Sequence, residues 1–258
     1  MADQIRLQKF FTDSGTLSRR AAEEEILSGK VKVNGKVAKL GQKINPKKDI
    51  VEYKGEVIKP RNTKRFTYVM LNKPCGYLTT MSDDRGRKTV AELIKDVNTR
   101  VYPVGRLDMN SDGLLLFTDD GDLANMLTHP KHEIPKIYHV KVKGAKDDKK
   151  IEALGKAMEI DGYKIEPVKV ELVSVRDTAC VLKMTLYEGR NRQIRKMCEN
   201  VRLEVLSLRR VAIGKLTMGD LPQGKWRYLS GDEVKYLKDS MKIAKAKLER
   251  NNKVKEKK

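Results

Sequence analysis

One segment of this chain, residues 104–121, limits the possible folds more than any other. It places a carboxylate, Asp108, directly after a Gly-Arg-Leu turn, and an apolar run from Leu114 to Phe117 follows soon after. An ionised carboxylate beside buried apolar residues is costly unless a cation pairs with it or the protein uses it chemically. We therefore expect Asp108 to have either a cationic partner or a catalytic role.

The same segment has the spacing of a calcium-binding loop. Asp108, Asn110 and Asp112 occupy the first, third and fifth positions of an EF-hand pattern. An EF-hand also needs a bidentate Glu at the twelfth position and a helix on each side. The twelfth position is instead Asp119, and residues 99–106 contain the Pro, Gly and β-branched residues of a strand or loop. The sequence therefore disfavours a calcium site.

The charge balance indicates the class of partner. The 258 residues include 55 Lys and Arg against 35 Asp and Glu, a formal net charge of +20, which favours nucleic acid before membrane. No apolar run approaches the roughly 20 residues of a spanning helix, and the N-terminus lacks the pattern of a signal peptide. We expect one or two domains, a cytoplasmic location, no membrane association and, by default, a monomer.

The cysteines and histidines do not form a recognisable metal or disulfide pattern. The three cysteines are isolated: Cys75, Cys180 and Cys198. The three histidines are closer together: His129, His132 and His139. Pro130 and Pro135 would break any helix that aligned these histidines on one face. We therefore expect no disulfide framework and no metal site.

Residues 1–59 are predicted to form a small module of two helices and a β-hairpin. The first helix is expected over residues 6–12. The second begins after Ser18, a suitable N-cap, and ends at Gly29. Residues 31–37 then carry an Asn-Gly pair between short β-prone segments, which predicts a hairpin with a two-residue turn.

This arrangement resembles the alpha-L motif, a small RNA-binding domain first recognised in a ribosomal protein that binds ribosomal RNA. The resemblance covers about residues 4–50 and implies that basic residues of the two helices contact RNA phosphates: Arg6, Lys9, Arg19 and Arg20. Arg19 and Arg20 also begin a helix, where free N–H groups and the helix dipole favour phosphate. For each residue taken singly, solvated surface charge is the alternative.

A basic linker is expected at residues 60–66, followed by a larger domain over residues 67–234. Strands are predicted over residues 67–73, 138–142, 168–173, 179–186 and 205–212, and helices over residues 89–96, 123–128, 149–157 and 192–199. These elements interleave without regular βαβ spacing. The pattern predicts an α+β fold, with a mostly antiparallel mixed sheet flanked by helices.

The last segment, residues 235–258, is a predicted basic tail, with ten Lys and Arg against three Asp and Glu. Its start is expected to be helical. Residues 251–258 are expected to be disordered and to add nonspecific affinity for RNA. A solubilising tail without a binding role is the alternative.

Four further clusters accompany Asp108. Lys73-Pro74-x-Gly76 precedes it, Tyr138 follows it within residues 135–140, and two longer clusters lie at residues 188–197 and 208–229. In their order, spacing and residue types, these clusters resemble the motifs of the pseudouridine synthases. The sharpest match is with the RsuA/RluB-like branch, which modifies single sites in ribosomal RNA. The resemblance spans nearly the whole chain and includes the N-terminal module.

The resemblance implies isomerisation of uridine to pseudouridine, in which the N-glycosidic bond is cut, the uracil rotates and its C5 joins the ribose C1′. Asp108 would stabilise or attack C1′, and Arg195 would hold that carboxylate ionised. Tyr138 would stack on the uracil. Arg106 would occupy the space left by a flipped-out base. The resemblance implies no cofactor and no metal.

Three other basic residues of these clusters are expected to contact the RNA backbone: Lys73, Arg190 and Arg192. Without the family pattern, the residues alone favour a turn residue for Asp108 and a core aromatic for Tyr138, and Arg195 is exchangeable with its basic neighbours. The resemblance favours 23S ribosomal RNA of the large subunit as the substrate. The alternatives are 16S ribosomal RNA of the small subunit, or a non-catalytic rRNA-binding assembly factor on the same scaffold.

Overall fold

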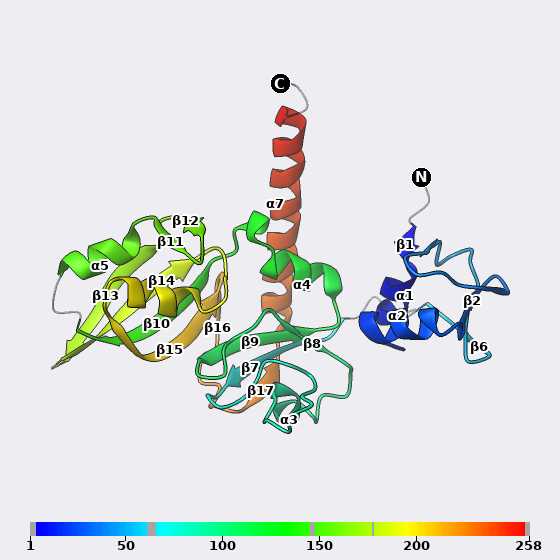
Figure 1. Cartoon of the computed structure of the whole chain (residues 1–258), viewed down its shortest axis with the longest axis horizontal. Coiled ribbons are helices and arrows are strands. Elements are labelled where there is room, and N and C mark those ends of the chain that lie inside the picture. The colour runs from blue at the N-terminus through cyan, green and yellow to red at the C-terminus, as the bar shows by residue number, and fades with distance from the viewer. Residues whose placement is uncertain (1–3, 61–65, 145–147, 177, 256–258) are drawn as a thin grey trace. The chain divides into compact units, whose positions relative to one another are not determined.

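The computed structural model describes residues 4–60, 66–144, 148–176 and 178–255 (Figure 1). The chain divides into two compact units, residues 1–66 and 67–258, and each unit has an apolar core of its own. The division falls at the end of the predicted linker. Most of that linker, residues 61–65, lies outside the described residues.

The first unit contains two helices that lie close to their predicted positions. Helix α1 covers Leu7–Asp13 and helix α2 covers Arg19–Leu27. The hydroxyl of Ser18 accepts a hydrogen bond from the backbone N–H of Ala21 at 3.1 Å, so Ser18 caps α2 as predicted. The core of the unit contains Leu7, Phe10, Phe11, Ala22, Ile26, Val31, Val33, Ala38, Ile44 and Val51.

The sheet of the first unit is larger than the predicted hairpin. Asn34 and Gly35, both with positive φ, form the turn of that hairpin. A second hairpin turns at Lys54 and Gly55 and pairs with the first, giving an order of β3-β2-β5-β6. The strands of this sheet are β2 (Val31–Val33), β3 (Lys36–Val37), β5 (Val51–Tyr53) and β6 (Glu56–Ile58). A separate pair is formed by β1 (Ile5–Arg6) and β4 (Lys43–Ile44).

The second unit is built on one nine-stranded mixed sheet. Its main path runs β13-β14-β10-β15-β9-β7-β17, with β16 beside β15 and β8 beside β9. All of these pairs are antiparallel except the pair of β15 and β9, which confirms the predicted fold class. The strands are β7 (Tyr68–Lys73), β8 (Tyr102–Val104), β9 (Asp112–Thr118), β10 (Lys136–Lys143), β13 (Lys169–Arg176), β14 (Ala179–Leu186), β15 (Glu204–Ile213), β16 (Leu216–Thr217) and β17 (Trp226–Tyr228). Strands β11 (Met158–Ile160) and β12 (Tyr163–Ile165) form a separate pair.

Helices cover this sheet and complete its cores. Leu154 of α5 and Met197 of α6 pack with Val140 and Leu182 of the sheet in one buried cluster. Helices α4 and α7 contribute to a second cluster with β7 and β9. The helices preceding α7 are α3 (Val90–Leu93), α4 (Gly121–Thr128), the 3-10 helix η1 (Pro130–His132), α5 (Asp148–Gly155) and α6 (Gln193–Asn200).

Helix α7 (Gly231–Lys255) replaces the predicted tail, and its first turns belong to the second unit. Leu237 is buried in the core, and Glu233 forms a bidentate ion pair with Arg227 of β17 at 2.7 Å. The disorder predicted for residues 251–258 is wrong as far as Lys255, because the preceding turns are rich in helix-forming Lys, Ala and Leu and an established helix extends at low cost. Residues 256–258 lie outside the described residues. Within the described ranges, no helix has the length and apolar character needed to cross a membrane.

A candidate active site on the central sheet

Asp108 lies in the loop that joins strands β8 and β9. The backbone carbonyl of Asp108 accepts a hydrogen bond from Ser111 N at 3.1 Å, which closes a tight turn. The Lys73 ammonium group donates to the carbonyls of Asp108 and Ser111 at 3.0 and 2.8 Å. The ammonium group of Lys73, the last residue of β7, therefore anchors this loop.

Lys73 cannot contact RNA phosphate in this structure, so that prediction is wrong. Its side chain is fully buried and donates a third hydrogen bond to the carbonyl of Pro74 at 3.1 Å. Burial lowers the pKa of Lys73 to about 8. Three backbone carbonyls compensate the buried charge, which explains why a lysine can lie inside the fold.

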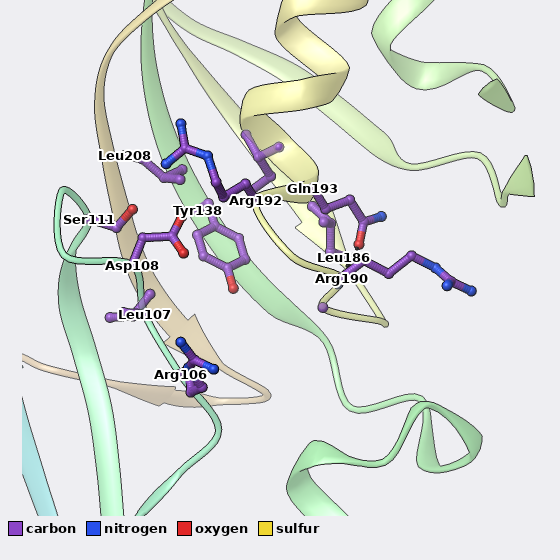
Figure 2. Close-up of a pocket in the computed structure, with 12 residues that line it drawn as sticks. Arg106, Leu107, Asp108, Ser111, Tyr138, Leu186, Arg190, Arg192, Gln193 and Leu208 are labelled. Carbon is purple, nitrogen blue, oxygen red and sulfur yellow. Dashed lines mark hydrogen bonds between the residues drawn. The ribbon is translucent and has the colours of Figure 1, made fainter. Parts of the chain in front are cut away.

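Tyr138 faces Asp108 from strand β10 across a cavity. Figure 2 shows the carboxylate of Asp108 directed toward the ring of Tyr138. The larger of two adjoining hollows has a volume of about 350 Å³, within the range of roughly 300–1,000 Å³ for small-molecule sites. Its lining residues include Arg106, Asp108, Thr128, Lys136, Tyr138, Glu188, Arg190, Arg192 and Arg210.

The start of helix α6 brings two arginines to the rim of the cavity. Arg192 has the left-handed backbone conformation, with φ 51°, which is uncommon for a residue with a side chain. In Figure 2 its side chain reaches back toward Asp108 and Tyr138, whereas the side chain of Arg190 points away. Both arginines line the cavity, and both are exposed at its rim.

Gln193 fixes the loop that precedes α6. Its side chain accepts a hydrogen bond from Arg190 N at 3.0 Å and donates one to Glu188 at 3.1 Å. Glu188 also pairs with the Arg190 guanidinium at 3.2 Å. Because Gln193 is buried, these bonds hold the cavity wall in one conformation.

Arg195 does not pair with Asp108 as predicted. Its guanidinium donates to the backbone carbonyl of Asn110 at 2.7 Å and lies 3.5 Å from the hydroxyl of Ser111. Among the residues that the structure describes, no ion pair joins Arg195 to Asp108. Arg195 therefore holds the turn that carries Asp108, and its effect on the carboxylate is indirect.

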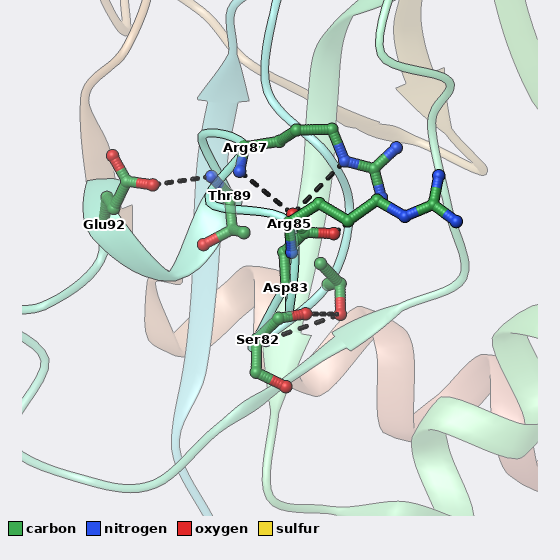
Figure 3. A network of polar contacts seen from close by, with 7 residues as sticks. Ser82, Asp83, Arg85, Arg87, Thr89 and Glu92 are labelled. Carbon is green, nitrogen blue, oxygen red and sulfur yellow. Dashed lines mark hydrogen bonds and ion pairs between the residues drawn. The ribbon is translucent and has the colours of Figure 1, made fainter.

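Arg106 lies at the rim of the cavity on a turn held by the loop of residues 78–89. The hydroxyl of Thr79 donates to the carbonyl of Leu107 at 2.6 Å and accepts from Leu107 N at 3.2 Å. Figure 3 shows the rest of this loop, where Asp83 accepts hydrogen bonds from the backbone and guanidinium of Arg87. These bonds lower the pKa of Asp83 to about 2.

Four buried polar residues of the cavity were not predicted as site residues: Ser111, Lys136, Gln193 and Arg210. Lys136 precedes Tyr138 by two residues on β10, so the two share a face of the sheet. Gln193 and Arg210 lie within sequence clusters that were recognised only by their resemblance to family motifs. A charged residue in a mostly apolar stretch was the signal available at Lys136 and Arg210, whereas Ser111 and Gln193 stand among polar and charged residues.

The calcium hypothesis has no support in the geometry. Strands β8 and β9, rather than helices, flank the loop, and the carboxylate of Asp112 pairs with the Arg209 guanidinium. In the described parts of the chain, no group of three or more His, Cys, Asp or Glu side chains is placed to hold a metal ion.

Comparison with known proteins agrees with this site. The RNA pseudouridylate synthase family matches residues 67–200, which contain Asp108, Tyr138 and Arg195. A protein of Aquifex aeolicus (strain VF5) described as an uncharacterized RNA pseudouridine synthase is 42% identical over 91% of this chain and 94% of its own length. The chain belongs to the pseudouridine synthase family.

Other members of the family extend the comparison. The ribosomal large subunit pseudouridine synthase B of Bacillus subtilis (strain 168) is 41% identical over 90% of this chain and 95% of its own length. The dual-specificity RNA pseudouridine synthase RluF of Escherichia coli (strain K12) is 35% identical over 89% of this chain and 77% of its own length. A crystal structure of a pseudouridylate synthase aligns with a TM-score of 0.64 and 28% identity, covering 90% of this chain and 99% of that one.

The first unit of this pseudouridine synthase matches the S4 domain family over residues 5–51, which confirms the predicted RNA-binding module. Arg6, Arg19 and Arg20 are exposed around the starts of α1 and α2. Lys9 pairs with Asp13 at 2.9 Å. Contact of these four residues with RNA stays a prediction.

Proposed function

We propose that this pseudouridine synthase isomerises a uridine of 23S ribosomal RNA with Asp108 as the catalytic carboxylate. The observation that carries the proposal is the convergence of Asp108, Tyr138 and Arg192 on one cavity. The cavity is large enough for a base and has a cationic rim. A base extruded from an RNA strand would enter it, while its phosphates stay at the rim.

In this mechanism Asp108 acts on the ribose. Cleavage of the bond between C1′ and N1 leaves C1′ electron-poor, and the carboxylate stabilises or attacks it. Tyr138 stacks on the uracil and limits how the freed ring turns before C5 joins C1′. The proton lost from C5 is balanced by the proton gained at N1, so the net change is an isomerisation that consumes no second substrate.

The rim residues have separate tasks in the proposal. Arg106 fills the space that the extruded base leaves in the RNA, since it lies at the mouth of the cavity on a turn fixed by Thr79. Arg190 and Arg192 hold the phosphates on either side of the target. Their guanidinium groups are exposed and suited to bidentate contacts with phosphate.

The choice of 23S ribosomal RNA rests on the relatives. The Bacillus subtilis relative is named for the large ribosomal subunit, and an S4 domain accompanies the catalytic domain here. A target in 16S ribosomal RNA is the alternative. We also propose that the enzyme acts as a monomer in the cytoplasm, where ribosomal RNA is available before and during subunit assembly.

The test is release of tritium from ribosomal RNA labelled at uridine C5. We expect release by the unaltered protein and none by Asp108→Asn, with equal RNA affinity. Asp96→Asn is a matched control, because Asp96 is exposed and outside the cavity. Equal release by Asp108→Asn would refute the role of Asp108. Absence of release by the unaltered protein from either rRNA or a ribosomal precursor would favour a non-catalytic assembly factor.

A further inference from the structure

Two buried cations form the floor of the cavity. Lys136 and Arg210 are 9% and 4% exposed, and both line the larger hollow beside Tyr138. No carboxylate pairs with either of them among the described residues. Buried cations without a paired anion are costly, so their presence requires an explanation.

The hydrogen-bonding capacity of this pair is incompletely used. Arg210 donates from Nε to the carbonyl of Leu114 at 2.7 Å, but its buried Nη2 has no partner. The Lys136 ammonium group has one long contact, 3.4 Å to the carbonyl of Tyr187. Both side chains therefore have N–H groups available to a ligand in the cavity.

Strand geometry places both cations beside the ring of Tyr138. Lys136 and Tyr138 are two residues apart on β10 and so share one face of the sheet, although a register shift lies between them. Tyr138 is directly opposite Arg210 on β15. Side chains at opposite positions of neighbouring antiparallel strands lie about 5 Å apart at Cβ. A base stacked on Tyr138 is thus within reach of both cations.

The cavity therefore has cations at two depths. Arg106, Arg190 and Arg192 are exposed at the rim, where RNA phosphates remain in water. Lys136 and Arg210 lie at the floor, where a phosphate would have to lose most of its hydration. The uracil base is the part of the substrate that enters to this depth.

We propose that Lys136 and Arg210 bind the carbonyl oxygens of uracil and stabilise the charge that the base gains when its bond to ribose breaks. The inference rests on the proposed function of the same site. The electron pair of the C1′–N1 bond leaves with uracil and spreads over N1 and the carbonyl oxygens. Asp108 balances the electron deficit at C1′, and neither cation gives up a proton.

Burial of Lys136 and Arg210 strengthens their attraction to the negative charge on uracil. An interaction between a fixed cation and a developing anion is stronger in a dry cavity than in water, and the cations need no reorganisation during the reaction. Burial and the neighbouring Arg210 charge lower the pKa of Lys136 to about 8, so the ammonium form still predominates at neutral pH.

The experiment compares Lys136→Met and Arg210→Lys with the unaltered protein. Lys141→Met is a matched control on the same strand, because Lys141 is exposed and outside the cavity. The rate of tritium release is measured in single turnover at saturating RNA. The RNA dissociation constant and its salt dependence are measured separately. Thermal unfolding identifies which variants are folded. Should Lys136→Met not fold, Arg210→Lys still tests the inference, because it keeps the buried charge.

We expect the saturating rate to fall about 100-fold in folded Lys136→Met, and by a smaller factor in Arg210→Lys, which keeps the charge but loses donors of the guanidinium group. The RNA dissociation constant and its salt slope should be unchanged in both variants. A weaker affinity with a shallower salt slope and an unchanged saturating rate would assign the pair to phosphate and overturn the inference. An unchanged rate and affinity would show a purely structural role and overturn it as well. Failure of the proposed function is distinct, since the unaltered protein would then release no tritium.

Discussion

The ammonium group of Lys73 lies 3.0 Å from the backbone carbonyl oxygen of Asp108, although the two residues are far apart in sequence. Lys73 ends strand β7, and Asp108 lies in the loop before β9, the strand that pairs with β7. The same ammonium group also donates a hydrogen bond to the backbone carbonyl of Ser111 at 2.8 Å. The position of the proposed catalytic carboxylate thus depends on a lysine that never meets solvent.

Replacement of Lys73 by methionine is expected to reduce both stability and turnover. Three carbonyls would lose a charged donor, although the carbonyl of Asp108 keeps its bond from Ser111 N. A buried acceptor left unsatisfied costs about 1–3 kcal/mol, partly offset by the removal of a buried charge. Urea unfolding and tritium release at saturating RNA measure the two effects. Lys95→Met, at an exposed position, is the control. An unchanged turnover in folded Lys73→Met would show that the loop holds Asp108 without this lysine.

Gly113 is expected to tolerate no side chain. Its φ is 107°, and a Cβ atom would lie 2.2 Å from the carbonyl oxygen of Arg210, across the parallel pair of β9 and β15. Relieving this clash would push the two strands apart at the cavity floor, so we expect Gly113→Ala to destabilise the protein by more than about 3 kcal/mol.

Gly121→Ala supplies the comparison for that prediction. Gly121 begins helix α4 and lacks a positive φ, and a Cβ atom added there would meet no other atom within 4 Å. Alanine there should leave stability unchanged or raise it slightly, because alanine restricts the unfolded chain more than glycine does. Chemical denaturation of both variants would test the pair, and equal stabilities would contradict the packing argument.

The sequence alone was sufficient for features that depend on local chemistry. Ser18 caps α2, and Asn34 with Gly35 turns the first hairpin, because these residues favour those conformations wherever they occur. The second hairpin was missed, since its turn has Lys54 rather than Asn or Asp before Gly55. A lysine seldom adopts a positive φ, and the paired strands supply the stabilisation that the turn lacks.

Features that depend on distant contacts could not be predicted. Lys73 is buried because carbonyls from another segment surround it, and Arg195 contacts Asn110 rather than Asp108 because of how α6 approaches the loop. Composition suggested a separate basic tail, but burial of Leu237 makes the start of α7 part of the core. In each case the deciding contact joins residues far apart in the chain.

Asp83 is expected to keep the loop of residues 78–89 ordered to unusually low pH. Hydrogen bonds from Arg87 lower its pKa from 3.8 to about 2. A depressed carboxyl pKa contributes stability that is complete above about pH 4 and is lost as the pH falls through about 2. A carbon-13 NMR titration of the Asp83 carboxyl measures this directly, and a midpoint near 4 would contradict it.

The same loop offers a test at neutral pH. We expect Asp83→Asn to speed cleavage by trypsin after Arg85 and Arg87, because the neutral amide loses the ion pair with Arg87. Asp84→Asn removes the same charge from the next position, which is exposed, and should leave the cleavage rate unchanged. Equal rates for both variants would show that Asp83 does not order the loop.

Removal of residues 1–59 is expected to impair substrate choice more than chemistry. The two units have separate cores, and Asp108, Tyr138 and Arg192 all belong to the second unit. The truncated enzyme should release tritium more slowly at low RNA concentration and at additional uridines. Mapping the modified positions in rRNA is the measurement, and complete retention of site choice would refute the role given to the first unit.

Arg195 is expected to control turnover without contributing to RNA affinity. Its guanidinium holds the Asn110 carbonyl at 2.7 Å, and a hydrogen bond from a charged donor contributes about 1.5–3 kcal/mol. Loss of that bond in Arg195→Gln would let the turn move, and we expect the saturating rate to fall roughly 10- to 100-fold because Asp108 is no longer held at C1′. Arg195→Lys should recover part of the rate, since a shorter donor can still approach Asn110. Single-turnover rates and RNA dissociation constants for both variants test this. A weakened affinity at an unchanged saturating rate would instead place Arg195 among the RNA contacts.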